Sequence, residues 1–65
     1  MDSKQIDAAM RDRLPVMCDG FKYDRILEYV MWYDNVGKRR LSLVLLAGKT
    51  TCRVPAENVE LIKRD

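Results

Sequence analysis

From Ser3 to Leu14, large apolar residues recur every four positions and most of the other side chains are polar. Ile6, Met10 and Leu14 follow this spacing, which places them on one narrow stripe of a helix. Asp2 or the serine after it can cap such a helix, and a glutamine three positions after Asp2 completes the pattern of a capping box. The pattern predicts a helix over about residues 3–14, ended by the proline that follows.

After this proline, short extended runs alternate with residues that favour turns. Asp19-Gly20 is typical of a type I′ hairpin turn, and residues 34–37 suit a type I turn followed by a glycine bulge. Gly48-Lys49 fits a two-residue type II′ hairpin, because its first position requires a positive φ. The strands predicted between and after these turns cover residues 16–18, 23–34, 39–47 and the segment from about residue 51.

The two longer hairpins set a register for the predicted sheet. The turn at Gly48 places Leu45 opposite Cys52, and the turn at residues 34–37 places Met31 opposite Leu41. The remaining pairs predicted in this way are Leu46 with Thr51, Val44 with Arg53, Leu43 with Val54, Tyr29 with Leu43, and Leu27 with Leu45. Both hairpins therefore predict the same core face, which includes Leu43, Leu45, Cys52 and Val54.

The opposite face of this sheet is also apolar. It is predicted to carry Ile26, Val30, Trp32, Val44 and Leu46. A small sheet does not leave so large an apolar surface in water. Either the helix stripe covers this face, or a protein partner or a second copy of the chain does, as in a homodimer.

Charge is distributed unevenly along the chain, although the net charge is only +2. Residues 35–56 contain no acid. The bases in this stretch are Lys38, Arg39, Arg40, Lys49 and Arg53. On the predicted register Arg40 lies beside Trp32, so that the indole can stack on a base while the cations meet phosphates, or Arg40 can simply cover the indole. Nucleic-acid binding through residues 38–53 is the alternative hypothesis.

The end of the chain, residues 52–62, resembles the end of an SH3-like barrel: a strand, a proline-led 3-10 turn and a short closing strand. The resemblance is by motif only over residues 53–61 and loosely covers residues 15–62. It implies a mainly β fold, namely a five-stranded SH3-like barrel over about residues 15–62, preceded by one N-terminal α-helix. Asn58 stands where peptide-binding members carry a tyrosine, so the resemblance does not extend to proline-rich ligands. The chain is also similar to small uncharacterised proteins of phages and mobile elements of Gram-positive bacteria, which implies no activity.

The residues offer little for catalysis. The chain has no histidine, and its two cysteines, Cys18 and Cys52, lie far apart in the sequence, so neither a zinc site nor an activated thiol is expected. Both are expected to be buried thiols, with a disulfide as the alternative. Gly48-Lys49 with the threonine after it matches only the tail of a phosphate-binding loop, because the first glycine would fall at Leu43. We expect no enzyme activity, no cofactor, no metal and no small-molecule substrate.

The length of the chain predicts its domain organisation. Sixty-five residues allow a single domain, residues 1–65, with one thin core. No apolar run approaches the ~20 residues that cross a bilayer, and the start lacks the apolar core of a signal peptide. The expected location is the cytoplasm without membrane contact. The expected function is protein interaction or self-association through the Trp32 face.

Overall fold

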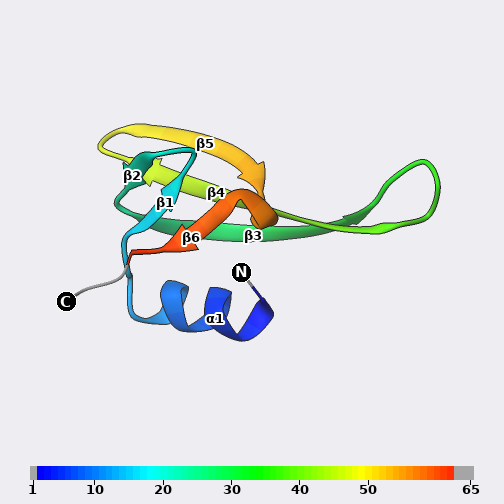
Figure 1. The fold of residues 1–65 in the computed structure, drawn as a ribbon, viewed down its shortest axis with the longest axis horizontal. Helices are drawn as coiled ribbons and strands as arrows, with labels where there is room; N and C mark the ends of the chain where they lie inside the picture. Colours follow the sequence, from blue (N-terminus) through cyan, green and yellow to red (C-terminus); the bar gives the residue numbers. More distant parts are fainter. Residues whose placement is uncertain (1, 63–65) are drawn as a thin grey trace.

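The protein is mainly β in the computed structural model, which describes residues 2–62. Within those residues one helix, six strands and a 3-10 turn form two three-stranded antiparallel sheets (Figure 1). The sheets have the strand orders β2-β1-β6 and β3-β4-β5. The elements are α1 (Ser3–Arg11), β1 (Val16–Cys18), β2 (Phe21–Tyr23), β3 (Arg25–Tyr33), β4 (Arg39–Ala47), β5 (Thr50–Pro55), η1 (Ala56–Asn58) and β6 (Val59–Leu61).

The predicted five-stranded SH3-like barrel is wrong, since the two sheets do not close into one barrel. The single strand predicted over residues 23–34 divides at Asp24 into β2 and β3, which belong to different sheets. The backbone N–H of Asp24 donates to the carbonyl of Leu46, and its carboxylate accepts from the N–H of Gly48 at 2.8 Å. Asp24 thus fixes the corner where the chain leaves one sheet for the other, while η1 precedes the last strand as predicted.

Helix α1 begins as the sequence predicts but ends three residues earlier. Asp2 is the N-cap of a complete capping box. The helix ends at Arg11 because Arg13 adopts a left-handed conformation with φ of 53°. The N–H of Arg13 then donates to the carbonyl of Met10 and that of Leu14 to the carbonyl of Ala9. This is a Schellman motif, which ends the helix before the proline is reached.

The hairpin registers are confirmed over most of their length. In the β1–β2 turn both Asp19 and Gly20 have positive φ, as a type I′ turn requires. All the pairs predicted between β4 and β5 are present, and so are Met31↔Leu41 and Tyr29↔Leu43 between β3 and β4. The prediction of Leu27 opposite Leu45 is wrong, because the register shifts at this point and Ile26 pairs with Leu45 instead. Leu27 is the extra residue of a β-bulge.

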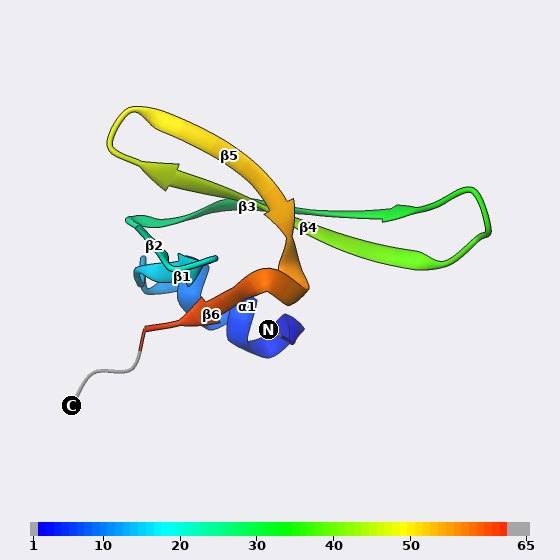
Figure 2. The same ribbon diagram turned by 45° about the horizontal axis from the view of Figure 1, so that its top comes forward.

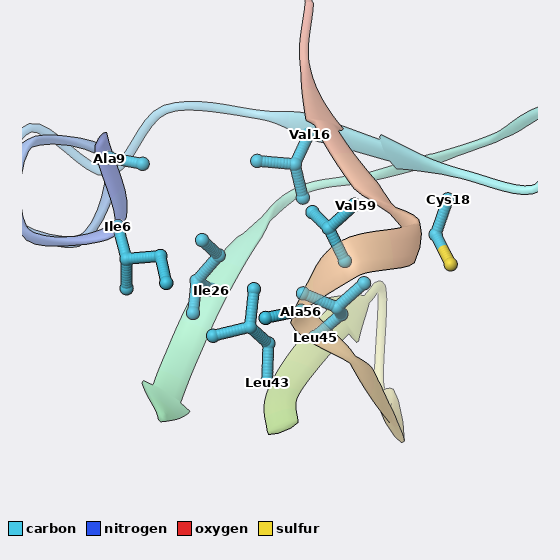
Figure 3. Packing of buried hydrophobic residues seen from close by; sticks show 9 residues of the cluster. All are labelled: Ile6, Ala9, Val16, Cys18, Ile26, Leu43, Leu45, Ala56 and Val59. Carbon is cyan, nitrogen blue, oxygen red and sulfur yellow. The ribbon is translucent and has the colours of Figure 1, made fainter. Parts of the chain in front are cut away.

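The core lies between the two sheets and the helix. The side chains that point toward one another there come from α1, both sheets and η1 (Figure 3). The buried apolar residues are Ile6, Ala9, Val16, Cys18, Ile26, Leu43, Leu45, Ala56 and Val59. Burial of this set supplies the hydrophobic free energy that stabilises the fold.

The outer half of the β3–β4 hairpin extends away from this core (Figures 1 and 2). The last pair between β4 and β5 is Ser42↔Pro55, so beyond Ser42 the hairpin has two strands and no third among residues 2–62. The longest dimension of the molecule is accordingly 40 Å, against 24 and 20 Å for the other two. We call residues 31–41 the arm.

No helix within residues 2–62 has the length and apolar character needed to cross a bilayer.

Candidate interaction surface

The arm displays large apolar side chains to solvent. Met31 is 46% exposed, Tyr33 64% and Val36, at the turn, 85%. Trp32 is 40% exposed on the opposite face from Met31 and Tyr33. Exposed apolar residues scattered singly are ordinary, but several large ones gathered on one projecting element are typical of a contact surface.

The turn of the arm is held together by Asp34. Its carboxylate accepts hydrogen bonds from the backbone N–H groups of Val36 and Lys38, at 3.1 and 2.9 Å, and from Nε of Arg40 at 3.0 Å. The N–H of Lys38, together with Arg40 and the N–H of Val36, holds the pKa of Asp34 below its ordinary value, against the opposing effect of desolvation. The arm therefore has a defined tip at neutral pH.

The indole of Trp32 is also fixed in place. Its Nε1 donates to Oγ of Ser42 at 3.1 Å, and Ser42 is buried, with 7% of its surface exposed. Trp32 lies opposite Arg40 in the ladder. Beside it is an open hollow of about 570 Å³ between the arm and η1. Its lining consists of Trp32, Asp34, Lys38, Arg39, Arg40, Leu41, Ser42, Pro55, Ala56 and Glu57.

The second apolar face predicted from the sequence is present only in part. Ile26 lies in the core at 3% exposure, because the bulge at Leu27 turns it inward. Val30, Val44 and Leu46 are half-buried, and only Trp32 is exposed. These four residues share the predicted face, but the only one of them that is exposed, Trp32, lies on the arm.

Helix α1 does not cover this face. Its buried residues, Ile6 and Ala9, belong to the cluster of Leu43 and Leu45, on the other side of the sheet. Val44, which lies between those leucines in the chain, points the opposite way because side chains alternate along a strand. Of the five residues predicted for the Trp32 face, only Ile26 shares the core cluster with the helix, so the hypothesis that the helix stripe covers this face is wrong for the other four.

The predicted bases do not form one patch. Lys38, Arg39 and Arg40 line the hollow beside Trp32. Lys49 lies in the β4–β5 turn at the other end of β4, and Arg53 pairs with Val44 in the middle of the sheet. Only the first three bases are brought together, and one of them, Arg40, forms an ion pair with Asp34.

Tyr29, Met31 and Tyr33 are the surface residues that the sequence reasoning missed. The register assigns them to the core face, yet Tyr29 is 50% exposed and the other two are exposed as well. Length is the signal that could have identified them. Strand β3 has nine residues, whereas β5 has six and β1, β2 and β6 have three each, so the elements facing β3 are too short to cover its outer half.

The carboxylates at the turns have structural roles. Asp24 and Asp34 accept hydrogen bonds from turn backbone. Both cysteines are free thiols. Cys18 is buried, and this burial together with the neighbouring Asp19 raises the pKa of its thiol. Cys52 is exposed, so the prediction of two buried thiols is wrong for this residue. Among residues 2–62, no three Cys, Asp or Glu side chains are grouped to hold a metal ion.

Comparisons with family models, with curated proteins and with solved structures found no significant match to this chain.

Proposed function

We propose that this chain is a non-enzymatic protein-interaction module and that the arm is its contact surface. The observation that carries the proposal is the exposure of Met31, Trp32, Tyr33 and Val36 on a two-stranded projection. Aromatic residues and methionine are enriched in protein interfaces, whereas a surface that contacts only water rarely groups them.

The energetics of a hairpin support the same proposal. A two-stranded hairpin is marginally stable in water unless a hydrophobic face packs against something. The arm has apolar side chains on both faces and no third strand beyond Ser42 in the part of the chain that the structure describes. A partner that covers the arm buries its apolar surface, which favours binding, and stabilises the hairpin at the same time.

The test is photo-crosslinking from the arm. Benzoylphenylalanine replaces Tyr33 in one variant and Phe21, which is 70% exposed on β2, in a matched control. In extract of the cells that make the protein, we expect discrete protein adducts from position 33 and none of the same size from position 21. Equal labelling from both positions, or none from either, contradicts the proposal.

Nucleic-acid binding is a second candidate, supported by one observation: Lys38, Arg39 and Arg40 line the same hollow as Trp32. An indole beside cations is a surface on which a base stacks while phosphates are neutralised. Single-stranded oligonucleotides should then shift the amide resonances of residues 38–40, with an affinity that falls steeply with salt. Absence of shifts at low salt would exclude this candidate. Because Lys49 and Arg53 lie outside the hollow, we expect them to be unaffected.

A further inference from the structure

Strand β3 is an edge strand whose outer side is unpaired along the arm. The sheet order is β3-β4-β5, so only one side of β3 has a neighbour within residues 2–62. The N–H of Asp34 donates to the carbonyl of Lys38 at 3.0 Å, which identifies these two as a hydrogen-bonded pair of the antiparallel ladder. In this part of β3 the even-numbered residues therefore direct their backbone N–H and C=O groups toward β4. The N–H and C=O groups of Tyr29, Met31 and Tyr33 point to the open side.

Natural proteins protect such edges with lysine, proline, a bulge or a covering element. Between Tyr29 and Tyr33 there is no charged residue and no proline, and the bulge lies before this segment, at Leu27. Within residues 2–62 no strand pairs with this side of β3. Helix α1 contacts β3 but leaves Tyr29, Met31 and Tyr33 from 46 to 64% exposed. The outer part of β3 is thus a strand ready for pairing.

The sequence of this segment is complementary to itself. In antiparallel pairing of two copies about Met31, each Met31 lies opposite the other, Tyr29 lies opposite Tyr33, and Val30 lies opposite Trp32. Every opposed pair is apolar or aromatic, which is the kind of cross-strand pair that stabilises a sheet. The open sides of positions 29, 31 and 33 match in this register, because position 31 becomes a hydrogen-bonded pair on the two-fold axis.

We propose that the partner of the arm is a second copy of this chain, which adds its own β3 antiparallel to the first and joins two three-stranded sheets into one of six strands. This inference rests on the proposed function and names its partner. The two-fold axis passes beside Met31, so each copy contributes the same residues and the association closes at a dimer.

The register also sets the limits of the contact. The next pair outward brings Glu28 opposite Asp34 of the second copy, and like charges directly opposite are unfavourable. Asp34 is already engaged by Arg40 and by two backbone N–H groups. Pairing is therefore confined to residues 29–33.

The area fits a weak dimer. A fully buried aromatic side chain hides about 150–250 Å², so half-exposed side chains leave roughly 100 Å² each to be covered. Tyr29, Met31, Trp32 and Tyr33 together offer roughly 400 Å² per copy on this basis, or roughly 800 Å² for the two copies. This total lies below the ~1,200 Å² of stable interfaces and corresponds to a weak, transient association. We expect a dimer that dissociates on dilution in the micromolar range.

Sedimentation of the full chain against concentration tests this, with Met31→Pro as the decisive variant. The N–H of Met31 does not bond to β4, so proline is compatible with the folded monomer, yet it removes the central donor and blocks the edge. We expect at least tenfold weaker dimerisation for Met31→Pro and near wild-type behaviour for Met31→Leu. Trp32 fluorescence and circular dichroism confirm that both variants are folded.

Disulfide trapping tests the register in a Cys52→Ser background. Hydrogen-bonded antiparallel pairs have Cα atoms about 5.5 Å apart, a separation that a disulfide spans. Met31→Cys should form a covalent dimer on mild oxidation. Tyr33→Cys should not do so alone but should crosslink to Tyr29→Cys in a mixture.

A chain that stays monomeric at millimolar concentration, or one in which Tyr33→Cys traps as readily as Met31→Cys, overturns the inference. If such a monomer still crosslinks to another protein from position 33, the proposed function stands and only the second copy is wrong. If neither is observed, both fail.

Discussion

Asp34 shows how much one side chain contributes to the shape of the surface. Its two carboxylate oxygens accept from two backbone donors of the turn and from Arg40. Asp at the first position of a turn commonly bonds to backbone two residues later. Here the same group also holds Arg40, so the order of the arm's tip and the position of one base both depend on its charge.

Removal of this charge should change the pH dependence of stability. The folded-state pKa of Asp34 is lowered from its ordinary value of 3.8, so its contribution is present above that value and is lost as the pH falls through the folded-state pKa. Asp34→Asn should therefore be less stable than the wild type in urea unfolding at pH 7, with a difference that shrinks at pH 3 and below. A difference that is constant from pH 7 to pH 2 would contradict this account.

At the scale of elements, the end of the helix is the most unusual local feature. Arg13 occupies the left-handed position of the Schellman motif, where glycine is usual. A side chain in this conformation is strained by contact between Cβ and the backbone. The carbonyls of Ala9 and Met10 are nevertheless satisfied, so hydrogen bonding compensates for the strain.

Arg13→Gly should stabilise the protein by about 1 kcal/mol, because the strain is relieved without loss of the two hydrogen bonds. Ala8→Gly, inside the helix, is the control and should destabilise by about 0.5–1 kcal/mol, because glycine loses more backbone entropy there. Thermal or urea unfolding measures both. Equal losses for the two variants would show that the left-handed site carries no strain.

The elements that were predicted correctly are those set by local chemistry. The turns at Gly20 and Gly48 and the capping box at Asp2 depend on residues next to one another, so their patterns are visible in the sequence. The corner at Asp24 and the bulge at Leu27 depend on contacts between distant segments. The helix end at Arg13 is local, but it uses a residue type that does not predict a left-handed conformation. No glycine marks any of these three sites.

The same distinction applies to the candidate surface. Trp32 and the bases at 38–40 were predicted because their residue types are conspicuous. Tyr29, Met31 and Tyr33 have the alternation of core residues, and only the arrangement of the short strands leaves them exposed. Alternation predicts which face a side chain is on, but not whether that face is covered.

At the scale of the whole molecule, a small core supports a long hairpin. The free energy of unfolding expected for a chain of 65 residues is roughly 3–10 kcal/mol. Ile6 is 1% exposed and links α1 to the sheet that carries the arm. Burial of one core residue therefore contributes a large part of the free energy of unfolding.

Ile6→Ala should lower the free energy of unfolding by about 2–5 kcal/mol, since a buried aliphatic side chain is removed and a cavity remains. Asp7→Ala, on the exposed side of the same helix, is the control and should change it by less than about 0.5 kcal/mol. Urea unfolding at a fixed low concentration measures both without a contribution from association. Similar values for the two variants would mean that the helix is not part of the cooperative unit.

The bulge at Leu27 has a consequence for how this molecule can change over evolution. The pairs on either side of it, Ile26↔Leu45 and Glu28↔Val44, follow one another on β4 without a gap, so deletion of Leu27 would leave every other pair intact. Because a bulge bends its strand and increases the twist, such a deletion would alter the direction of the arm but not the identity of the residues on its faces. Orientation and composition of the arm are thus encoded separately. Insertion or deletion of one residue at this bulge can change the direction of the arm, while substitutions change the side chains that the arm presents.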